Sequence, residues 1–474
     1  MGNLGQEAMQ FAFGIVLARL LTPADFGMII TIQVFTGFVG MVASGGMGQS
    51  LIRAKEASGD DFNAVFTLQI LLGIAICSAF FVSAPLLVAY LHNPLYADLL
   101  RVSALSFLLR PFTLIQVSWL TRNMDFKKRA LIDVAAGAAA GVLSVAMALA
   151  GMGVWSLVIS GLVGGLITNV SYYCVTSLRL RLNFDTNTVR RHAGYGFKIT
   201  ANDFLGYIKY QSINLILAKM AGPAFLGIFN KAESLSRMPN RLLTAPTCQT
   251  VFRAMSMVQD DLDRTKYMFF RTITLLLVYI TPMSVALWWV AEPFIGVVYG
   301  DKWLPAAEPL RILLLAGVLR AIGTPCGVVL AAQNRLMQEI IGQVLEVILI
   351  VTVCLIGLKW GLTGVAWALL INTVFATVYG YVLVYRAIRT RATQLVSAVA
   401  PALLLNAILV AVLASAHYLL TTLMPAAPFV YLVTMLVTGF VVYVSVFLFL
   451  PISALRSETE RWRRAIQGGF GFRP

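Results

Sequence analysis

The sequence predicts an all-α, polytopic membrane protein with about fourteen transmembrane helices. Two pseudo-symmetric lobes of six helices each would surround a central cationic cavity, and two extra helices would follow them. Three observations predict this architecture: a surplus of apolar residues along the whole chain, an alternation of basic residues between successive loops, and an internal repeat that relates the first six spans to the next six.

The composition excludes an ordinary soluble protein. Of the 474 residues, 59% are hydrophobic and only 12% are charged, whereas soluble domains average about 25% charged residues. A net charge of +15 would indicate nucleic acid in a soluble protein, but basic residues beside membrane helices are typical of cytoplasmic loops. We therefore expect no nucleic-acid partner. The five cysteines lie in apolar runs, and neither they nor the three histidines have metal-ligand spacing, so no metal or cofactor is expected.

The spans follow from the length that a bilayer demands, about 20 mostly apolar residues per helix. The first is the weakest, because it is short and contains Glu7 and Arg19. The predicted spans are 4–21, 25–52, 63–91, 99–121, 129–150, 153–178, 197–219, 224–252, 267–290, 306–332, 337–358, 361–386, 395–419 and 427–450.

Basic residues alternate between the loops of this prediction. Loops after even-numbered spans carry groups such as Lys127, Lys128 and Arg129, whereas loops after odd-numbered spans carry few. Cytoplasmic loops are rich in Lys and Arg, so both chain ends are predicted to be cytoplasmic. Trp303 and Tyr299 belong to a group of aromatic residues that we expect to form an interfacial belt at the outer end of spans nine and ten.

The internal repeat appears at three places in the same order. LARLLTPADFG at 17–27 returns as LAKMAGPAFLG at 217–227, and GVW at 153–155 resembles GVAW at 364–367. LLRVSALSFLLR at 99–110 returns as PLRILLLAGVLR at 309–320, which aligns Arg110 with Arg320.

The repeat predicts the domain organisation. Residues 1–182 would form an N-lobe of helices 1–6, and residues 183–392 a C-lobe of helices 7–12. Helices 13 and 14 would occupy 393–450, and 451–474 would be a basic amphipathic cytoplasmic tail on the inner leaflet. Six spans per repeat give both lobes the same orientation, with the symmetry axis along the membrane normal. A cavity between such lobes can open to alternate sides, which indicates a transporter.

Cationic residues inside the spans are the candidate substrate-binding residues, because ionisable groups at mid-membrane are costly. Arginine also matches phosphate geometry through its planar fork of donors. An alternative is that some of these residues are structural, through intrahelical pairing or by reaching the interface. The candidates are Arg110, Arg320, Arg237, Arg241, Lys209 and Lys231.

Acidic residues within or beside the spans are candidates for ion coupling or charge pairing. Glu339 and Glu346 share one face of span eleven, and a buried carboxylate there either pairs with an arginine or takes up a proton. Glu346 could therefore couple transport to a cation, or could be a structural partner of Arg320. Glu233, four residues before Arg237, and Asp203 in span seven are the other candidates.

An enzyme is not expected. The predicted outer loops, such as TPAD and AGPA, are short and offer no acid–base pair, and the phosphate-binding GxxxxGK[ST] pattern does not occur.

Several stretches resemble the polysaccharide-transporter family, the Wzx-type flippases of the multidrug/oligosaccharidyl-lipid/polysaccharide (MOP) exporter superfamily. They are LARLLTPADFGM at 17–28, LTRNMDFKKRALIDV at 120–134, GVWSLV at 153–158 and AEPFIGVVYGDKWLPAAEPLRIL at 291–313. The resemblance covers essentially the whole chain.

The resemblance implies a cargo and a place in the cell. The cargo would be an oligosaccharide repeat unit on undecaprenyl pyrophosphate, moved from the cytoplasmic to the periplasmic leaflet of the bacterial inner membrane. The product would serve exopolysaccharide, capsule or O-antigen synthesis, with membrane lipids and polysaccharide polymerase or export proteins as further partners. Two alternatives within the superfamily stay open: a drug or small-cation exporter and a peptidoglycan-precursor flippase.

Overall fold

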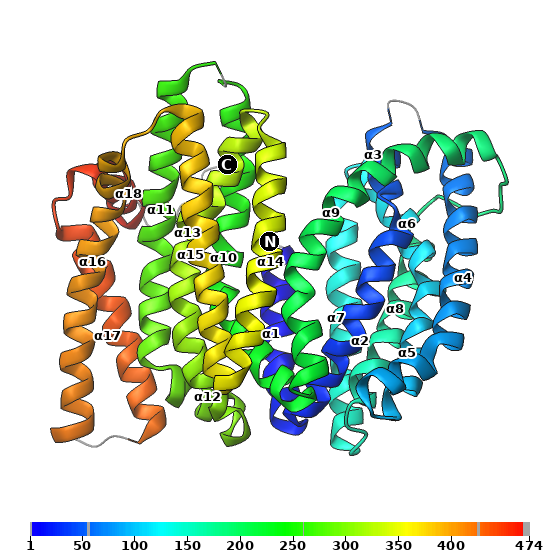
Figure 1. The fold of residues 1–474 in the computed structure, drawn as a ribbon, viewed down its shortest axis with the longest axis horizontal. Helices are drawn as coiled ribbons and strands as arrows, with labels where there is room; N and C mark the ends of the chain where they lie inside the picture. Colours follow the sequence, from blue (N-terminus) through cyan, green and yellow to red (C-terminus); the bar gives the residue numbers. More distant parts are fainter. Residues whose placement is uncertain (1, 55–56, 259, 424–426, 468–474) are drawn as a thin grey trace. The chain divides into compact units, whose positions relative to one another are not determined.

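The computed structural model describes residues 2–54, 57–258, 260–423 and 427–467. Within these ranges the side chains at 2–4, 42, 187, 191–203, 336, 423 and 465–467 lie outside the description. The described residues form helices joined by turns and by one longer connection, 176–185, with no strand among them (Figure 1). The all-α prediction is therefore confirmed.

Contacts divide the chain into two units, Met1–Ile228 and Phe229–Pro474. The boundary falls inside the long helix α10 (Pro223–Ser256). In the first unit, helix α9 (Thr186–Met220) packs against α2, α3 and α4. The lobe boundary predicted from the repeat, between residues 182 and 183, is a different division and stays a prediction.

The first unit contains the helices that precede α10. Their bounds are α1 Gly2–Leu20, α2 Pro23–Ser44, α3 Met47–Arg53, α4 Gly59–Leu91, α5 Leu95–Ala104, α6 Ser106–Arg122, α7 Phe126–Leu149, α8 Trp155–Val175 and α9 Thr186–Met220.

The second unit contains most of α10 and everything after it. The α-helices are α11 Leu262–Trp289, α12 Ala291–Tyr299, α13 Ala307–Ala332, α14 Leu336–Gly357, α15 Gly361–Ile388, α16 Ala392–Tyr418, α17 Pro428–Phe449 and α18 Arg456–Gln467. Short helical turns are η1 Asp301–Ala306, η2 Leu358–Trp360, η3 Leu419–Leu423 and η4 Ser453–Leu455.

Each predicted span overlaps a helix of the structure. Among the described residues, ten segments are long and apolar enough to cross a membrane, and one of them, Met337–Ile388, contains both α14 and α15. The protein is therefore a multi-pass membrane protein. Helices α1, α9 and α10 do not belong to these apolar segments of the described chain. Polar helices are stable in a membrane only against protein or a water-filled space.

Local sequence signals set the helix ends. The Thr22 hydroxyl accepts a hydrogen bond from the backbone N–H of Asp25, and the backbone N–H of Thr22 donates to the Asp25 carboxylate. This capping box starts α2 beside Pro23. At the other end, Gly45 and Gly46 adopt left-handed backbone conformations (φ 53° and 60°). The predicted continuous span 25–52 is therefore two helices, because these two glycines end α2 before α3 begins.

Each unit has its own apolar core. In the first, buried residues of α2, α4, α5, α6 and α8 pack together, among them Ile32, Tyr96 and Phe107. In the second, α10, α11, α13, α15, α16 and α17 surround a larger core that includes Phe269 and Val384. These cores position the candidate residues on α6 and α13.

The tail, made of η4 and α18, packs against the rest of the second unit. Leu455 is fully buried, and the indole Nε1 of Trp462 donates a hydrogen bond of 2.9 Å to the hydroxyl of Tyr279 on α11. The sequence also predicts an apolar face of this tail formed by Leu455, Trp462, Ile466 and Phe470, and the side chains of Ile466 and Phe470 lie outside the described residues.

Candidate functional site

Arg110 lies in the apolar segment Leu95–Arg122 with its side chain exposed. Its guanidinium carbon is 4.5 Å from the ring centre of Phe107, one turn earlier on α6. The guanidinium also occupies the space beside Gly40 on α2, where an added Cβ would overlap Nη1. An arginine stacked on an aromatic ring and exposed within an apolar segment can bind an anion with its remaining donors.

A polar side chain supports the backbone next to this arginine. Asn169 on α8 donates to the carbonyl of Leu109 at 3.2 Å and accepts a hydrogen bond from the hydroxyl of Thr113 at 2.7 Å. Pro111 interrupts the hydrogen bonding of α6 at this point, because proline has no N–H. Asn169 therefore holds the proline-interrupted turn that carries Arg110.

The second repeat has the same kind of support. The hydroxyl of Thr377 on α15 donates to the carbonyl of Leu319 at 3.3 Å, immediately before Arg320. In both units, then, the sixth span of the repeat bonds to the carbonyl that precedes the repeated arginine. The sequence aligned the arginines, but the supporting residues differ in type and could not be aligned.

Aromatic residues adjoin Arg110 in the first unit. The hydroxyl of Tyr207 on α9 donates to the carbonyl of Val34 at 2.7 Å, and its position is possible because Gly37 has no side chain. Phe38 lies 5.6 Å from Phe204 and 6.1 Å from Tyr207, between ring centres. We call Phe38, Phe204, Tyr207 and Arg110 the α2–α6–α9 surface.

Arg320 differs from Arg110 although the repeat makes them equivalent. Both terminal nitrogens of its guanidinium are buried. The neighbouring helix α14 carries the two candidate acids: Glu346 is 8% exposed, and a Cβ on Gly327 of α13 would lie 3.2 Å from a carboxylate oxygen of Glu339. The guanidinium end of Arg320 and the side chain of Glu346 are therefore buried in the second unit, and the half-buried Glu339 lies against α13.

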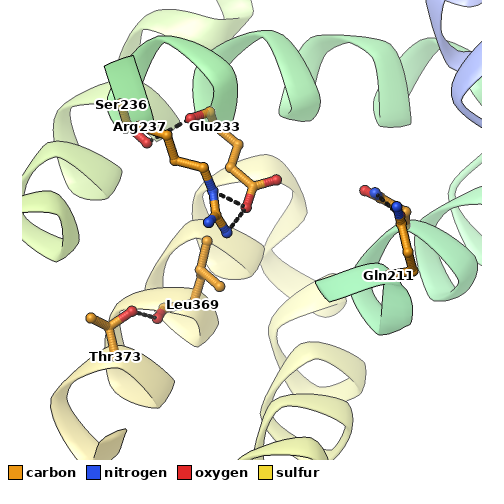
Figure 2. Close-up of polar contacts among 7 residues, drawn as sticks. Gln211, Glu233, Ser236, Arg237, Leu369 and Thr373 are labelled. Atoms are coloured by element: carbon orange, nitrogen blue, oxygen red, sulfur yellow. Dashed lines mark hydrogen bonds and ion pairs between the residues drawn. The ribbon is translucent and has the colours of Figure 1, made fainter. Parts of the chain in front are cut away.

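Arg237 is paired within its own helix. Its Nε and Nη2 lie 2.9 Å and 2.5 Å from the same carboxylate oxygen of Glu233. Figure 2 shows this pair directed toward Leu369 on α15. Glu233 is 8% exposed, so the pair is largely removed from water. The alternative of intrahelical pairing, considered from the sequence, is confirmed for these two residues.

Lys231 lies in an aromatic cage of the second unit. Its ammonium nitrogen is 4.6 Å from the ring centre of Tyr299 and 4.9 Å from that of Trp303. The expectation that Tyr299 and Trp303 belong to a lipid-facing belt is wrong, because both are buried. Their ring faces lie against the Lys231 ammonium group of α10, an arrangement in which the rings and the cation attract each other. Lys231 thus connects α10 to α12 and η1.

The remaining cationic candidates lie on α9 and α10. Lys209 on α9 is half-buried, and Arg241 on α10 is exposed one turn beyond Arg237. The side chain of Asp203 lies outside the described residues.

Sequence reasoning missed Asn169, Thr377, Tyr207 and the glycines of α2. The signal for the glycines was present, because Gly37 and Gly40 recur at helical spacing and such small residues allow close approach of neighbouring helices. The polar residues gave no comparable signal, since single Asn, Thr and Tyr residues are common in membrane helices.

The fold is that of known membrane transport proteins. The structure matches a lipid II flippase MurJ in an inward closed conformation with a TM-score of 0.74 and 15% identity, covering 98% of each chain. It matches an inward-facing multidrug resistance MATE family transporter of the MOP superfamily with a TM-score of 0.64 and 15% identity, covering 82% of this chain and 96% of the other. At these identities the likeness shows the fold.

Sequence comparison identifies the family. Residues 16–308 match the family described as polysaccharide biosynthesis protein, and the chain belongs to this family. It is 25% identical over 373 residues to the lipopolysaccharide biosynthesis protein WzxC of Escherichia coli K12, covering 77% of this chain and 75% of WzxC. It is also 25% identical over 326 residues to the succinoglycan biosynthesis transport protein ExoT of Rhizobium meliloti, covering 69% of this chain and 65% of ExoT. The resemblance stated from the sequence is thereby confirmed.

Proposed function

We propose that the protein moves undecaprenyl-pyrophosphate-linked oligosaccharide repeat units from the cytoplasmic to the periplasmic leaflet of the bacterial inner membrane. It works by alternating access, driven by an ion gradient, and supplies exopolysaccharide, capsule or O-antigen synthesis. The names of WzxC and ExoT, which tie those relatives to polysaccharide synthesis and transport, support the class of cargo. The alternation of basic residues between loops supports cytoplasmic chain ends.

The observation that carries the proposal is the environment of Arg110. An exposed arginine within an apolar membrane segment needs an anionic partner, because a charge there is otherwise costly. A pyrophosphate can accept its hydrogen bonds in pairs. The rings of Phe38, Phe204 and Tyr207 beside it offer apolar faces for the body of a large amphipathic cargo.

The other candidates take different roles in this proposal. Arg241 and Lys209 add positive charge along the cargo path, and Arg237 and Lys231 add charge that Glu233 and the aromatic cage hold in place. The buried guanidinium of Arg320 on α13 contributes its charge close to the helix that carries Glu339 and Glu346, α14. Glu346 and Glu339 are the candidate coupling residues, with Asp203 a further candidate.

The test is flipping in proteoliposomes with a fluorescent undecaprenyl-pyrophosphate oligosaccharide. Arg110→Ala should reduce the flipping rate at least tenfold, since a lost charge-assisted hydrogen bond weakens binding by about that factor. Arg101→Ala is the matched control, because Arg101 precedes Arg110 by nine residues and pairs with Asp98 at 3.7 Å. Equal rates for Arg110→Ala and wild type would remove Arg110 from the cargo site.

The same assay separates the alternatives within the superfamily. A lipid II-type cargo moved as fast as the oligosaccharide would favour a peptidoglycan-precursor flippase. Transport of a small organic cation in place of either lipid would favour a drug exporter.

A further inference from the structure

A cavity of about 1050 Å³ with both polar and apolar lining lies within the second unit, and none of the candidate cargo residues line it. The N-terminal ends of α11 and α16 form two of its sides, and the start of the tail helix α18 forms the third. Thr274 and Ala398 line the cavity and connect α11 to α16, with the threonine hydroxyl 2.9 Å from the alanine carbonyl oxygen.

The wall that α18 contributes is fixed by Arg271 of α11. Its Nη1 donates to the carbonyl of Ala454 at 2.6 Å, and its Nη2 donates to the hydroxyl of Ser457 at 2.9 Å and to Glu458 at 3.1 Å. Both members of the Arg271–Glu458 ion pair are largely buried, with side chains 21% and 18% exposed. Arg271 is thus committed to holding α18, and ligand binding falls to other residues of the lining.

Charges of both signs surround the opening. Lys266 lies 2.9 Å from Asp263 on α11, and Arg456 lies 2.9 Å from Glu460 on α18. The side chains of Asp263 and Arg456 are 93% and 82% exposed, so both can turn toward a ligand at little cost. A purely anionic ligand would meet the two carboxylates as well as the cations. A ligand with a phosphate and an ammonium group can bind all four.

The length of α11 predicts that the cavity lies at the depth of lipid headgroups. Helix α11 has 28 residues, and at the helical rise it is longer than the hydrocarbon core, which is about 30 Å thick. We therefore expect its first turns, with Asp263, Lys266 and Tyr267, to lie at the headgroup level on the side that the charge alternation predicts to be cytoplasmic. Tyr267 is exposed and also lines the cavity, as expected for an aromatic residue at the interface.

We propose that this cavity binds the headgroup of a zwitterionic phospholipid that carries a phosphodiester and a primary ammonium group. Lys266 and Arg456 hold the phosphate, with the hydroxyls of Ser397 and Ser457 in the same lining. Asp263 and Glu460 accept hydrogen bonds from the ammonium group. The bound lipid thereby links α18 to α11 and α16. The site is independent of the proposed cargo site.

The test titrates the purified full-length protein in detergent with dihexanoyl-phosphatidylethanolamine and follows the bound lipid by native mass spectrometry. Dihexanoyl-phosphatidylglycerol and inorganic phosphate are the comparison ligands. We expect the ethanolamine lipid to bind at least tenfold more tightly than either. Equal binding of the glycerol lipid would overturn the zwitterionic assignment, and equal binding of phosphate would overturn the assignment to a lipid.

Two variants and one control tie the binding to the cavity. Lys266→Gln and Glu460→Gln should each weaken binding about tenfold, since each removes a charged hydrogen-bond partner. Lys128→Gln is the matched control, because Lys128 forms the same kind of pair with Asp125, three residues earlier at 3.0 Å, in the first unit. If Lys266→Gln also lowers the thermal unfolding midpoint without lipid, its weaker binding could come from lost stability. The binding measured for Glu460→Gln then tests the proposal. Unchanged binding in Glu460→Gln would overturn the proposal.

Discussion

Gly27 and Gly227, at corresponding positions of the internal repeat, each pack against the backbone beside the other. A Cβ on Gly27 would overlap the carbonyl oxygen of Pro223, and a Cβ on Gly227 would overlap that of Pro23. Such an exchange of equivalent contacts is what a two-fold relationship produces. The sequence LARLLTPADFG therefore has a second copy at 217–227 because the two copies meet each other where α2 and α10 begin.

The reciprocal packing of Gly27 and Gly227 predicts that replacing either glycine causes a similar loss of stability. Gly27→Ala and Gly227→Ala should each lower the free energy of unfolding by about 1–3 kcal/mol, because the added methyl group forces two backbones apart. Gly161→Ala is the control, since an added Cβ on α8 has no atom within 4 Å, and it should be neutral or slightly stabilising. Thermal unfolding in detergent measures all three. A Gly227→Ala variant as stable as Gly161→Ala would contradict the reciprocal contact.

Gly40→Ala should impair transport while leaving the fold intact. The new methyl group would take the space of the Arg110 guanidinium, which is the mobile end of a long side chain and can move aside. Flipping should therefore fall toward the rate of Arg110→Ala with little change in unfolding temperature. Gly206→Ala on α9, with no neighbour within 4 Å, is the control and should flip like wild type. Full activity of Gly40→Ala would mean that the observed position of Arg110 is not the one used in transport.

Replacing Asn169, which supports the turn that carries Arg110, should lower both the stability and the flipping rate. Asn169→Ala removes the bonds to the carbonyl of Leu109 and to Thr113, and should cost about 1–3 kcal/mol of stability. It should also slow flipping, because Arg110 then sits on a loosened turn.

Thr377 allows a matched comparison in the second repeat. Thr377→Val removes the bond to the Leu319 carbonyl at nearly constant volume, whereas Thr377→Ser keeps it. Unfolding temperatures should therefore rank wild type and Thr377→Ser above Thr377→Val. The same unfolding temperature for the Val and Ser variants would show that the bond contributes nothing.

Lys231 should matter for stability through its charge. Lys231→Met keeps the length of the side chain but loses the attraction to Tyr299 and Trp303, which should cost about 0.5–2 kcal/mol. Lys231→Arg retains a cation over the rings and should be milder. Thermal unfolding of both variants measures the difference. A Lys231→Met variant that is fully stable but transports poorly would move Lys231 from the cage to the cargo site.

Much of the fold could be predicted from the sequence, because membrane helices are set by local apolar composition and by basic residues in the loops. Every predicted span overlaps a helix, although Gly45 and Gly46 divide one of them. The repeat related Gly27 to Gly227, but nothing local indicated that the two copies touch.

The site was predictable only in part. The pairing of Glu233 with Arg237 could be considered from their spacing, because residues four apart share a helix face. The contact of Arg110 with Gly40, and that of Asn169 with Leu109, join helices distant in the sequence. Arg110 is exposed, whereas the guanidinium nitrogens of Arg320 are buried. This difference arises from their neighbours in the fold, which identical spacing within the repeat cannot reveal.

The central claim is that Arg110 recognises a pyrophosphate, and a comparison of two cargoes tests it most directly. Flipping rates should be measured for the same oligosaccharide on undecaprenyl pyrophosphate and on undecaprenyl monophosphate, with wild type and Arg110→Ala. Wild type should prefer the pyrophosphate at least tenfold, and Arg110→Ala should lose most of this preference. An Arg110→Ala variant that keeps the wild-type preference would contradict the account.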